Sequence, residues 1–291
     1  MERYGQWSSI YYPSKFVSLN PLRSTIAIFV LTFAIFGLLL GFSESFDTER
    51  EDKVNLAASS VENKIAGYVA AMKVSSELAE VRSVSQVDSI STAQMGIPEN
   101  SDVEKRQVAR QLLNEHSEFK SIFFLTPSGD VYLGEPFEQQ KQLPSLNYAD
   151  RDWYQGVNAT NAPYVSSVFM SAAINAPAVA VAVPVLAQDQ IVGYWVAIVD
   201  LADIRSLLAE FSGESRVLLV DHRATEVADT ARTGELSELR SLDSLQGITR
   251  VLAGEEGTSV EQIDGTTVDA RFAPVDANPN TWGLFFFESP D

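Results

Sequence analysis

The side chains best suited to ligand chemistry lie close together near the middle of the chain. The stretch Asn147–Val157, NYADRDWYQGV, brings Arg151, Trp153 and Tyr154 into four consecutive positions. An arginine guanidinium binds a carboxylate through two parallel hydrogen bonds, which a lysine ammonium cannot do. The two aromatic rings can wall a dry pocket, and their faces attract cations. This set of residues predicts a binding site for a small charged ligand.

The same residues also have a purely structural interpretation, which the sequence leaves open. In that interpretation Arg151 forms an ion pair with Asp150 or Asp152, and Trp153 and Tyr154 belong to the hydrophobic core. The position of this stretch in the fold has to decide between the two.

The composition argues against enzyme chemistry. The 291 residues include no cysteine and two histidines, His116 and His222, which lie far apart. This excludes disulfides and thiolate chemistry, and it disfavours histidine-dependent metal and serine-hydrolase sites. The sequence also has no phosphate-binding glycine-rich loop and no Gly-x-Ser-x-Gly motif. We therefore expect no enzymatic activity, and we assign no cofactor and no metal.

The charge balance makes nucleic acid an unsuitable partner. The chain has 21 Lys and Arg against 39 Asp and Glu, with a formal net charge of −18. The chain therefore has no excess of Lys and Arg with which to neutralise nucleic-acid phosphates. A hydrophobic content of 45% provides a core for one large domain or two small ones.

An uncharged segment near the N-terminus is long enough to cross a membrane. Residues 24–43, STIAIFVLTFAIFGLLLGFS, would span roughly 30 Å as a helix, the thickness of the hydrocarbon core. A signal peptide would have a shorter apolar region, and GFSES is a poor cleavage site. A buried core helix would be shorter and less uniformly apolar. We therefore predict an uncleaved single-pass anchor in the cell membrane.

The flanking charges predict the orientation of this anchor. Arg3, Lys15 and Arg23 precede it, whereas an acidic cluster follows it. Because cations remain on the cytoplasmic side, residues 1–23 are expected to form a cytoplasmic tail, and the main domain is expected outside the cell.

The rest of the chain predicts an α+β fold. Apolar residues at helical spacing from Phe46 to about Val87 predict one long stalk helix, to which we assign residues 44–94. A second helix, a β-hairpin, three further strands and a helix follow, at residues 103–119, 122–133, 162–200 and 201–211. A strand-turn-strand, a helix, a hairpin and a last strand come next, at residues 215–228, 238–254, 257–275 and 281–288. This order indicates two antiparallel sheets.

These segments together resemble the extracellular double Cache sensor domain of chemoreceptors and sensor kinases. The resemblance rests on SIFFLTPSGDVYL, ADRDWYQGV, GYWVAIVDLADI and VLLVDHRATEV, in this order and spacing. It covers most of the chain after residue 43. It implies a long N-terminal helix that carries two PAS-like modules, a membrane-distal one at residues 95–213 and a membrane-proximal one at residues 214–291. It also implies that a small ligand binds in the distal module.

The resemblance extends to a binding motif. Many amino-acid-binding and amine-binding members carry an arginine, a Trp-Tyr pair and a later aspartate, and Arg151, Trp153, Tyr154 and Asp200 match these positions. The resemblance implies that Arg151 holds a carboxylate and that Asp200 accepts an ammonium group. The expected ligand is therefore an amino acid, an amine or a small carboxylate.

The match to this motif is incomplete. Members with the full motif carry tyrosines where this chain has Leu146 and Phe169, so two hydroxyl groups are missing. We include Phe169 in the predicted site, together with Tyr164 and Ser166 from the same segment.

Two functions are compatible with these features. The first is a membrane-anchored sensor that signals through a partner or a further C-terminal part, because no output domain or second membrane helix precedes Asp291. The alternative is a structural or interaction subunit that uses the Cache fold as a scaffold. In either case the long N-terminal helix is a candidate homodimer interface.

Overall fold

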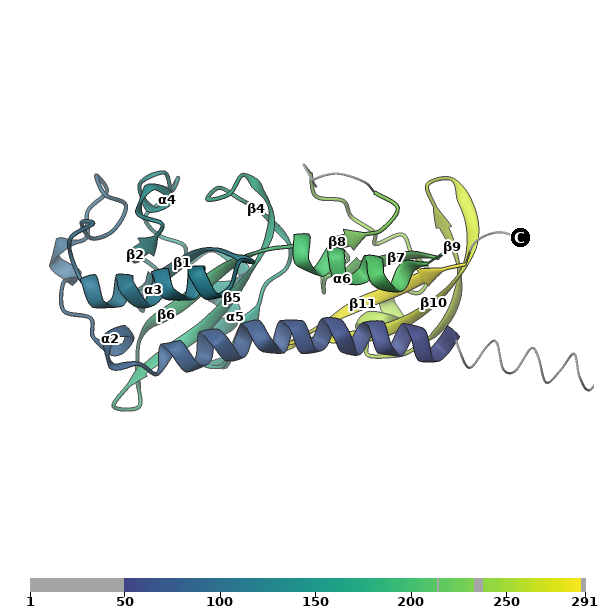
Figure 1. Ribbon diagram of the computed structural model, residues 1–291, viewed down its shortest axis with the longest axis horizontal. Helices are drawn as coiled ribbons and strands as arrows, with labels where there is room; N and C mark the ends of the chain where they lie inside the picture. Colours follow the sequence, from purple (N-terminus) through teal and green to yellow (C-terminus); the bar gives the residue numbers. More distant parts are fainter. Residues whose placement is uncertain (1–49, 214, 233–237, 289–291) are drawn as a thin grey trace, which may run out of the picture. The chain divides into compact units, whose positions relative to one another are not determined.

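The structure is a computed structural model that describes residues 50–213, 215–232 and 238–288 (Figure 1). The predicted cytoplasmic tail and membrane anchor, residues 1–43, lie outside the described residues. No helix within the described ranges is long and apolar enough to cross a membrane.

One long helix packs on both sheets (Figure 1), and its described part covers residues 50–76. Its buried side chains form one core with strands of both sheets. They recur at the spacing of one helix face, at Val54, Ala57, Ala58, Val61, Ile65, Tyr68, Val69 and Met72. The Trp195 indole donates to Ser75 Oγ at 3.1 Å in the first sheet. The Asp276 N–H donates to Glu62 Oε1 at 2.9 Å in the second sheet.

The long helix ends earlier than the sequence pattern predicts. It stops at Ser76, and α2 (Ala79–Arg82) and the 3-10 helix η1 (Val87–Ser89) follow as separate short elements. The hydroxyl groups of Ser75 and Ser76 donate to carbonyl oxygens of the preceding turn. Such bonds compete with the backbone ladder and favour a helix end. The prediction that one helix continues to about Val87 is therefore wrong.

The first sheet forms the centre of the module predicted to be membrane-distal. Its strand order is β2-β1-β6-β5-β3, with β4 also paired to β5, and all pairs are antiparallel. The strands are β1 (Phe119–Leu125), β2 (Val131–Glu135), β3 (Tyr164–Val165), β4 (Phe169–Ser171), β5 (Ala176–Ala187) and β6 (Gln190–Asp200). The predicted hairpin and the long strands are confirmed.

Helices cover this sheet, and two of them were not predicted. α3 (Val103–Glu115) was predicted and is confirmed, although it ends four residues earlier than expected. α4 (Phe137–Lys141) and α5 (Asp152–Thr160) lie between the predicted hairpin and the predicted strands, where no helix was predicted. α6 (Ala202–Ser212) follows β6, as predicted, and packs against the second sheet.

The two faces of β6 show how the sheet separates core from candidate site. Trp195, Ala197 and Val199 pack into the core that includes the long helix. Tyr194 and Ile198, on the opposite face, pack into a second cluster with α5. Successive strand residues point to opposite faces, so the same strand serves both. The candidate site therefore lies on the face turned away from the long helix.

The second sheet forms the centre of the module predicted to be membrane-proximal. Its order is β8-β7-β11-β10-β9, again fully antiparallel. The strands are β7 (Arg216–Val220), β8 (Glu226–Asp229), β9 (Gly257–Ile263), β10 (Thr266–Ala277) and β11 (Asn280–Phe287). The predicted turn at Asp264-Gly265 joins β9 and β10, and both residues have a positive φ. All of the strands predicted for this module are confirmed.

The helix predicted at residues 238–254 is much shorter in the structure. Only α7 (Ile248–Leu252) is helical. Upstream of α7, the N–H of Leu242 donates to Ala224 O at 2.7 Å, and Glu261 accepts the N–H of Gly247 at 2.8 Å. Because these partners satisfy the backbone outside any helix, the segment does not need helical hydrogen bonds.

Candidate ligand-binding site

A small cavity lies on the α5 side of the first sheet. Its volume is about 60 Å³, on a scale where one water molecule takes roughly 10–15 Å³. The cavity lies between β1, the start of α5, β4 and β6. Its lining includes Phe123, Tyr148, Arg151, Trp153, Phe169, Ser171 and Ile198.

The local sequence of α5 places Arg151 and Trp153 at the cavity. Arg151 is the extended residue just before the helix, with φ −77° and ψ 143°. Asp152 in the first turn favours a helix start there, because negative charge stabilises a helix N-terminus. Trp153, Tyr154 and Val157 lie on one face and are buried against the sheet.

The guanidinium group of Arg151 is accessible to a ligand in the cavity. Its side chain is exposed at the cavity, and its guanidinium carbon lies 5.6 Å from the centre of the Tyr148 ring. No carboxylate of the described residues lies within 4.0 Å of it, and the neighbouring Asp152 pairs with Arg223 at 2.7 Å instead. The structure therefore does not form the Arg151 ion pair that the structural interpretation requires.

Of the two aromatic residues beside Arg151, one lines the cavity and the other does not. Trp153 is in the lining, with its ring nearly parallel to that of Tyr148 at 6.3 Å. Tyr154 is turned away: its hydroxyl donates to Pro127 O at 2.7 Å and its ring meets Tyr194 edge-on. Burial raises the pKa of Tyr154, so this hydroxyl stays protonated and remains a donor. Tyr154 therefore holds α5 on the sheet.

Asp200 occupies a different position from the one the motif implies. Its Oδ1 accepts the N–H of Ala202 at 2.8 Å, at the start of α6, and its Oδ2 lies 3.5 Å from Lys120 Nζ. It is not among the residues that line the cavity. Its charge is therefore compensated by Lys120 and by a backbone donor.

Of the three remaining predicted residues, one lines the cavity and two make contacts within the fold. Phe169 lines the cavity. Ser166 is buried, donates to Ser167 O at 2.6 Å and accepts the N–H of Ala180 at 2.8 Å, so it supports the pairing of the strands. Tyr164 covers Gly156 of α5, where an added Cβ would lie 2.3 Å from its ring.

Sequence reasoning missed several lining residues. Tyr148 was not among the predicted site residues, although it lies three positions before Arg151 and the entry to α5 brings the two together. Ser171 and Ile198 also line the cavity. The alternation of strand residues toward one face is the signal that could have found Ile198.

α5 also contacts the second module directly. Asp152 Oδ1 lies 2.7 Å from Arg223 Nη2, and Asp152 Oδ2 accepts the N–H of Ser167 at 2.8 Å. In the reverse direction, Asp221 Oδ2 accepts the N–H of Val168 at 2.6 Å. The turn between β7 and β8 is therefore bonded to both α5 and the β3–β4 connection.

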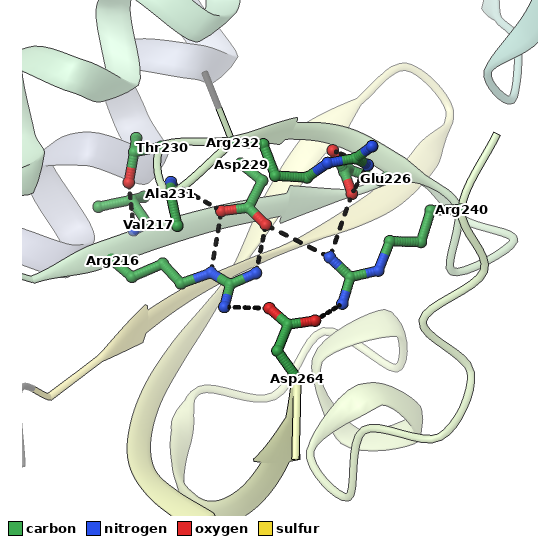
Figure 2. Close-up of polar contacts among 9 residues, drawn as sticks. All are labelled: Arg216, Val217, Glu226, Asp229, Thr230, Ala231, Arg232, Arg240 and Asp264. Atoms are coloured by element: carbon green, nitrogen blue, oxygen red, sulfur yellow. Dashed lines mark hydrogen bonds and ion pairs between the residues drawn. The ribbon is translucent and has the colours of Figure 1, made fainter. Parts of the chain in front are cut away.

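Unlike Arg151, the arginines of the second module drawn in Figure 2 are paired with carboxylates. Arg216 binds Asp229 through two hydrogen bonds of 2.9 and 2.5 Å, and Asp264 bridges Arg216 and Arg240 at 2.7 Å each. Arg232 pairs with the buried Glu226 at 2.9 Å. Each of these arginines has a carboxylate partner, so their charges are compensated within the second module.

A helix packed on two antiparallel sheets, with a mostly apolar cavity in the first module, defines a two-module α+β fold. The chain belongs to the Cache domain family, whose double form, dCache_1, matches residues 42–289. The family that the sequence resemblance predicted is thereby confirmed.

Solved structures share this fold. The ligand-binding domain of the Pseudomonas aeruginosa PAO1 amino acid chemoreceptor PctB, in complex with L-Arg, is 16% identical with a TM-score of 0.62, over 85% of this chain and 97% of that one. The domain of the Pseudomonas fluorescens chemoreceptor CtaA with L-leucine is 15% identical, with a TM-score of 0.62, over 85% and 96%. That of PctC from P. aeruginosa with GABA is 17% identical, with a TM-score of 0.60, over 83% and 99%. No protein of curated function matches the chain.

Proposed function

We propose that this chain is a sensor domain that binds a small carboxylate-bearing ligand in the cavity of its first module. The observation that carries the proposal is Arg151, a guanidinium exposed at a cavity with aromatic walls and without a carboxylate partner among the described residues. The ligands of the PctB, CtaA and PctC complexes, L-Arg, L-leucine and GABA, all carry a carboxylate. This supports a carboxylate-bearing ligand here as well.

We further propose a single-pass anchor at residues 24–43, with the N-terminus in the cytoplasm and the sensor domain outside the cell. The supporting observations are the uncharged run and the basic residues that precede it. Signalling then proceeds through a partner, a homodimer formed along the long helix, or a further C-terminal part. Protease treatment of intact cells should remove the domain, whereas protection of a tag placed after Asp291 would contradict this orientation.

Ligand binding is tested by a thermal-shift screen of the full chain in detergent micelles against amino acids, amines and small carboxylates. A ligand at 100 times its Kd adds about 2.7 kcal/mol to the free energy of unfolding. A hydrogen bond to a charged group contributes about 1.5–3 kcal/mol, so Arg151→Ala should weaken binding roughly tenfold or more. Arg82→Ala, at an exposed arginine of α2, is the matched control and should leave the affinity unchanged.

The alternative function, a scaffold subunit, is supported by a specific observation. Tyr154, Tyr164, Ser166 and Asp200 make contacts within the fold instead of lining the cavity. If the chain is a scaffold subunit, no compound of the screen should stabilise it. Arg151→Ala should then have no effect on the thermal shift beyond that of Arg82→Ala. That result would replace the sensor proposal.

A further inference from the structure

The cavity offers a ligand one charge, and that charge is positive. Of the residues that line it, Arg151 alone is ionisable at neutral pH, and no Asp or Glu is among them. The remaining walls are aromatic or aliphatic, with Ser171 and the Tyr148 hydroxyl as neutral polar groups. A ligand ammonium group would therefore have no anion to neutralise it within the cavity.

The acid that the binding motif assigns to an ammonium is already engaged. Asp200 is compensated by Lys120 at 3.5 Å and by the Ala202 N–H at 2.8 Å. Asp152, the residue directly after Arg151, is bonded to Arg223 and Ser167. Neither carboxylate is free to receive a ligand cation.

The aromatic walls do not replace the missing anion. The guanidinium of Arg151 already lies over the Tyr148 ring, at 5.6 Å from its centre. A second cation beside this ring would be repelled by Arg151. Moving an unpaired charge from water toward apolar walls is unfavourable, because the walls do not replace the lost hydration. An ammonium group therefore lowers the affinity of any ligand that Arg151 holds.

The cavity is partly open to solvent, and its volume sets the size of the ligand body that its walls can cover. A volume of about 60 Å³ corresponds to roughly four to six water-sized groups. A short aliphatic carboxylate of about two to four carbons, with about four to six non-hydrogen atoms, fits this volume on the same scale.

We propose that the cavity selects short monocarboxylates without an ammonium group, and disfavours the amino acids of the same carbon skeleton. Arg151 holds the carboxylate, and Trp153, Phe169 and Ile198 enclose the apolar body. This inference rests on the proposed ligand-binding function and narrows it to one chemical class.

The test uses three compounds of one carbon skeleton: butyrate, 2-aminobutyrate and butylamine. Calorimetry with the full chain in detergent micelles should give butyrate an affinity at least tenfold above that of 2-aminobutyrate, with no binding of butylamine. Equal or tighter binding of 2-aminobutyrate would overturn the selectivity and leave the sensor function intact. If neither these compounds nor the broader screen bind, the sensor function itself fails, and the selectivity with it.

A charge placed in the lining provides the second arm. Ser171→Asp adds a carboxylate at a buried lining position, and Ser171→Asn is its uncharged control of nearly the same size. The aspartate variant should shift the butyrate to 2-aminobutyrate affinity ratio at least tenfold toward the amino acid, whereas the asparagine variant should leave this ratio unchanged. A ratio that stays the same in a folded aspartate variant would refute the claim that the missing anion sets selectivity. If the aspartate variant does not fold, the ratio of the unmodified chain decides.

Discussion

Replacing Asp152 with asparagine removes a charge from the contact between α5 and the second module. The aspartate lies 2.7 Å from Arg223 Nη2, accepts the N–H of Ser167 at 2.8 Å and sits in the first turn of α5. Asparagine keeps one acceptor oxygen, so the Ser167 bond can persist. The change therefore removes the attraction to Arg223 and the interaction with the helix N-terminus, while its shape is nearly conserved.

The size of the effect follows from the exposure of the pair. The side chain of Arg223 is 59% exposed and that of Asp152 is 17% exposed, so the ion pair should contribute about 0.5–1 kcal/mol. The helix N-terminus adds about 0.3–1 kcal/mol. We expect the free energy of unfolding to fall by about 1–2 kcal/mol, and Tm by about 2–8 °C for a domain of this size.

A double-mutant cycle isolates the contact between the modules. Asp152→Asn and Arg223→Ala should be non-additive by about 0.5–1 kcal/mol in chemical denaturation. Glu138→Gln is the matched control, because Glu138 pairs with Lys141 at 2.9 Å on an exposed surface within one module. It should cost less than about 0.5 kcal/mol. A coupling below about 0.3 kcal/mol between Asp152 and Arg223 would refute the view that this pair joins the modules.

Three further predictions follow from the geometry. Asp200→Asn should lower Tm slightly, because it weakens the Lys120 contact, and calorimetry should show an unchanged ratio of butyrate to 2-aminobutyrate affinity; a changed ratio would place Asp200 in the site. Gly156→Ala should destabilise by about 1–3 kcal/mol in denaturation, since its Cβ would lie 2.3 Å from the Tyr164 ring, and a neutral effect would contradict that packing. The hydrogen bond from Arg216 lowers the pKa of Asp264, so this carboxylate stabilises the fold above its unfolded pKa of about 3.9. That contribution is lost as the pH falls through the folded pKa. The stability difference between Asp264→Asn and the unmodified chain should therefore shrink in denaturation below about pH 3.9, and a difference that persists there would exclude this charge effect.

The strands were predictable because their signals are local. The alternation in β5 and the Asp264-Gly265 turn between β9 and β10 each involve only neighbouring residues. α5 was missed because nine residues with a central glycine give a weak helical pattern, and its buried face depends on a sheet formed elsewhere. The long helix was predicted past Ser76 because apolar spacing does not show where serine side chains divert the backbone bonds.

The candidate site was predictable where residue type decides chemistry, and not where distant partners decide it. Arg151 and Trp153 were recognisable as a cation beside an aromatic wall, and both line the cavity. The ion pair between Asp200 and Lys120 forms because β1 and β6 are paired, and the sequence alone does not reveal this pairing. The ion pairs of Arg216 likewise join residues 13 and 48 positions apart.

Arg151 and Asp152 are adjacent in the sequence, and this adjacency links the cavity to the second module. One faces the cavity, and the next residue is bonded to the β7–β8 turn. If occupancy of the cavity changes the strength of the Asp152–Arg223 contact, thermodynamic reciprocity requires the reverse effect of equal size. A partner that altered the β7–β8 turn would then change the affinity of the proposed ligand site by the same factor, because Arg151 and Asp152 are adjacent residues.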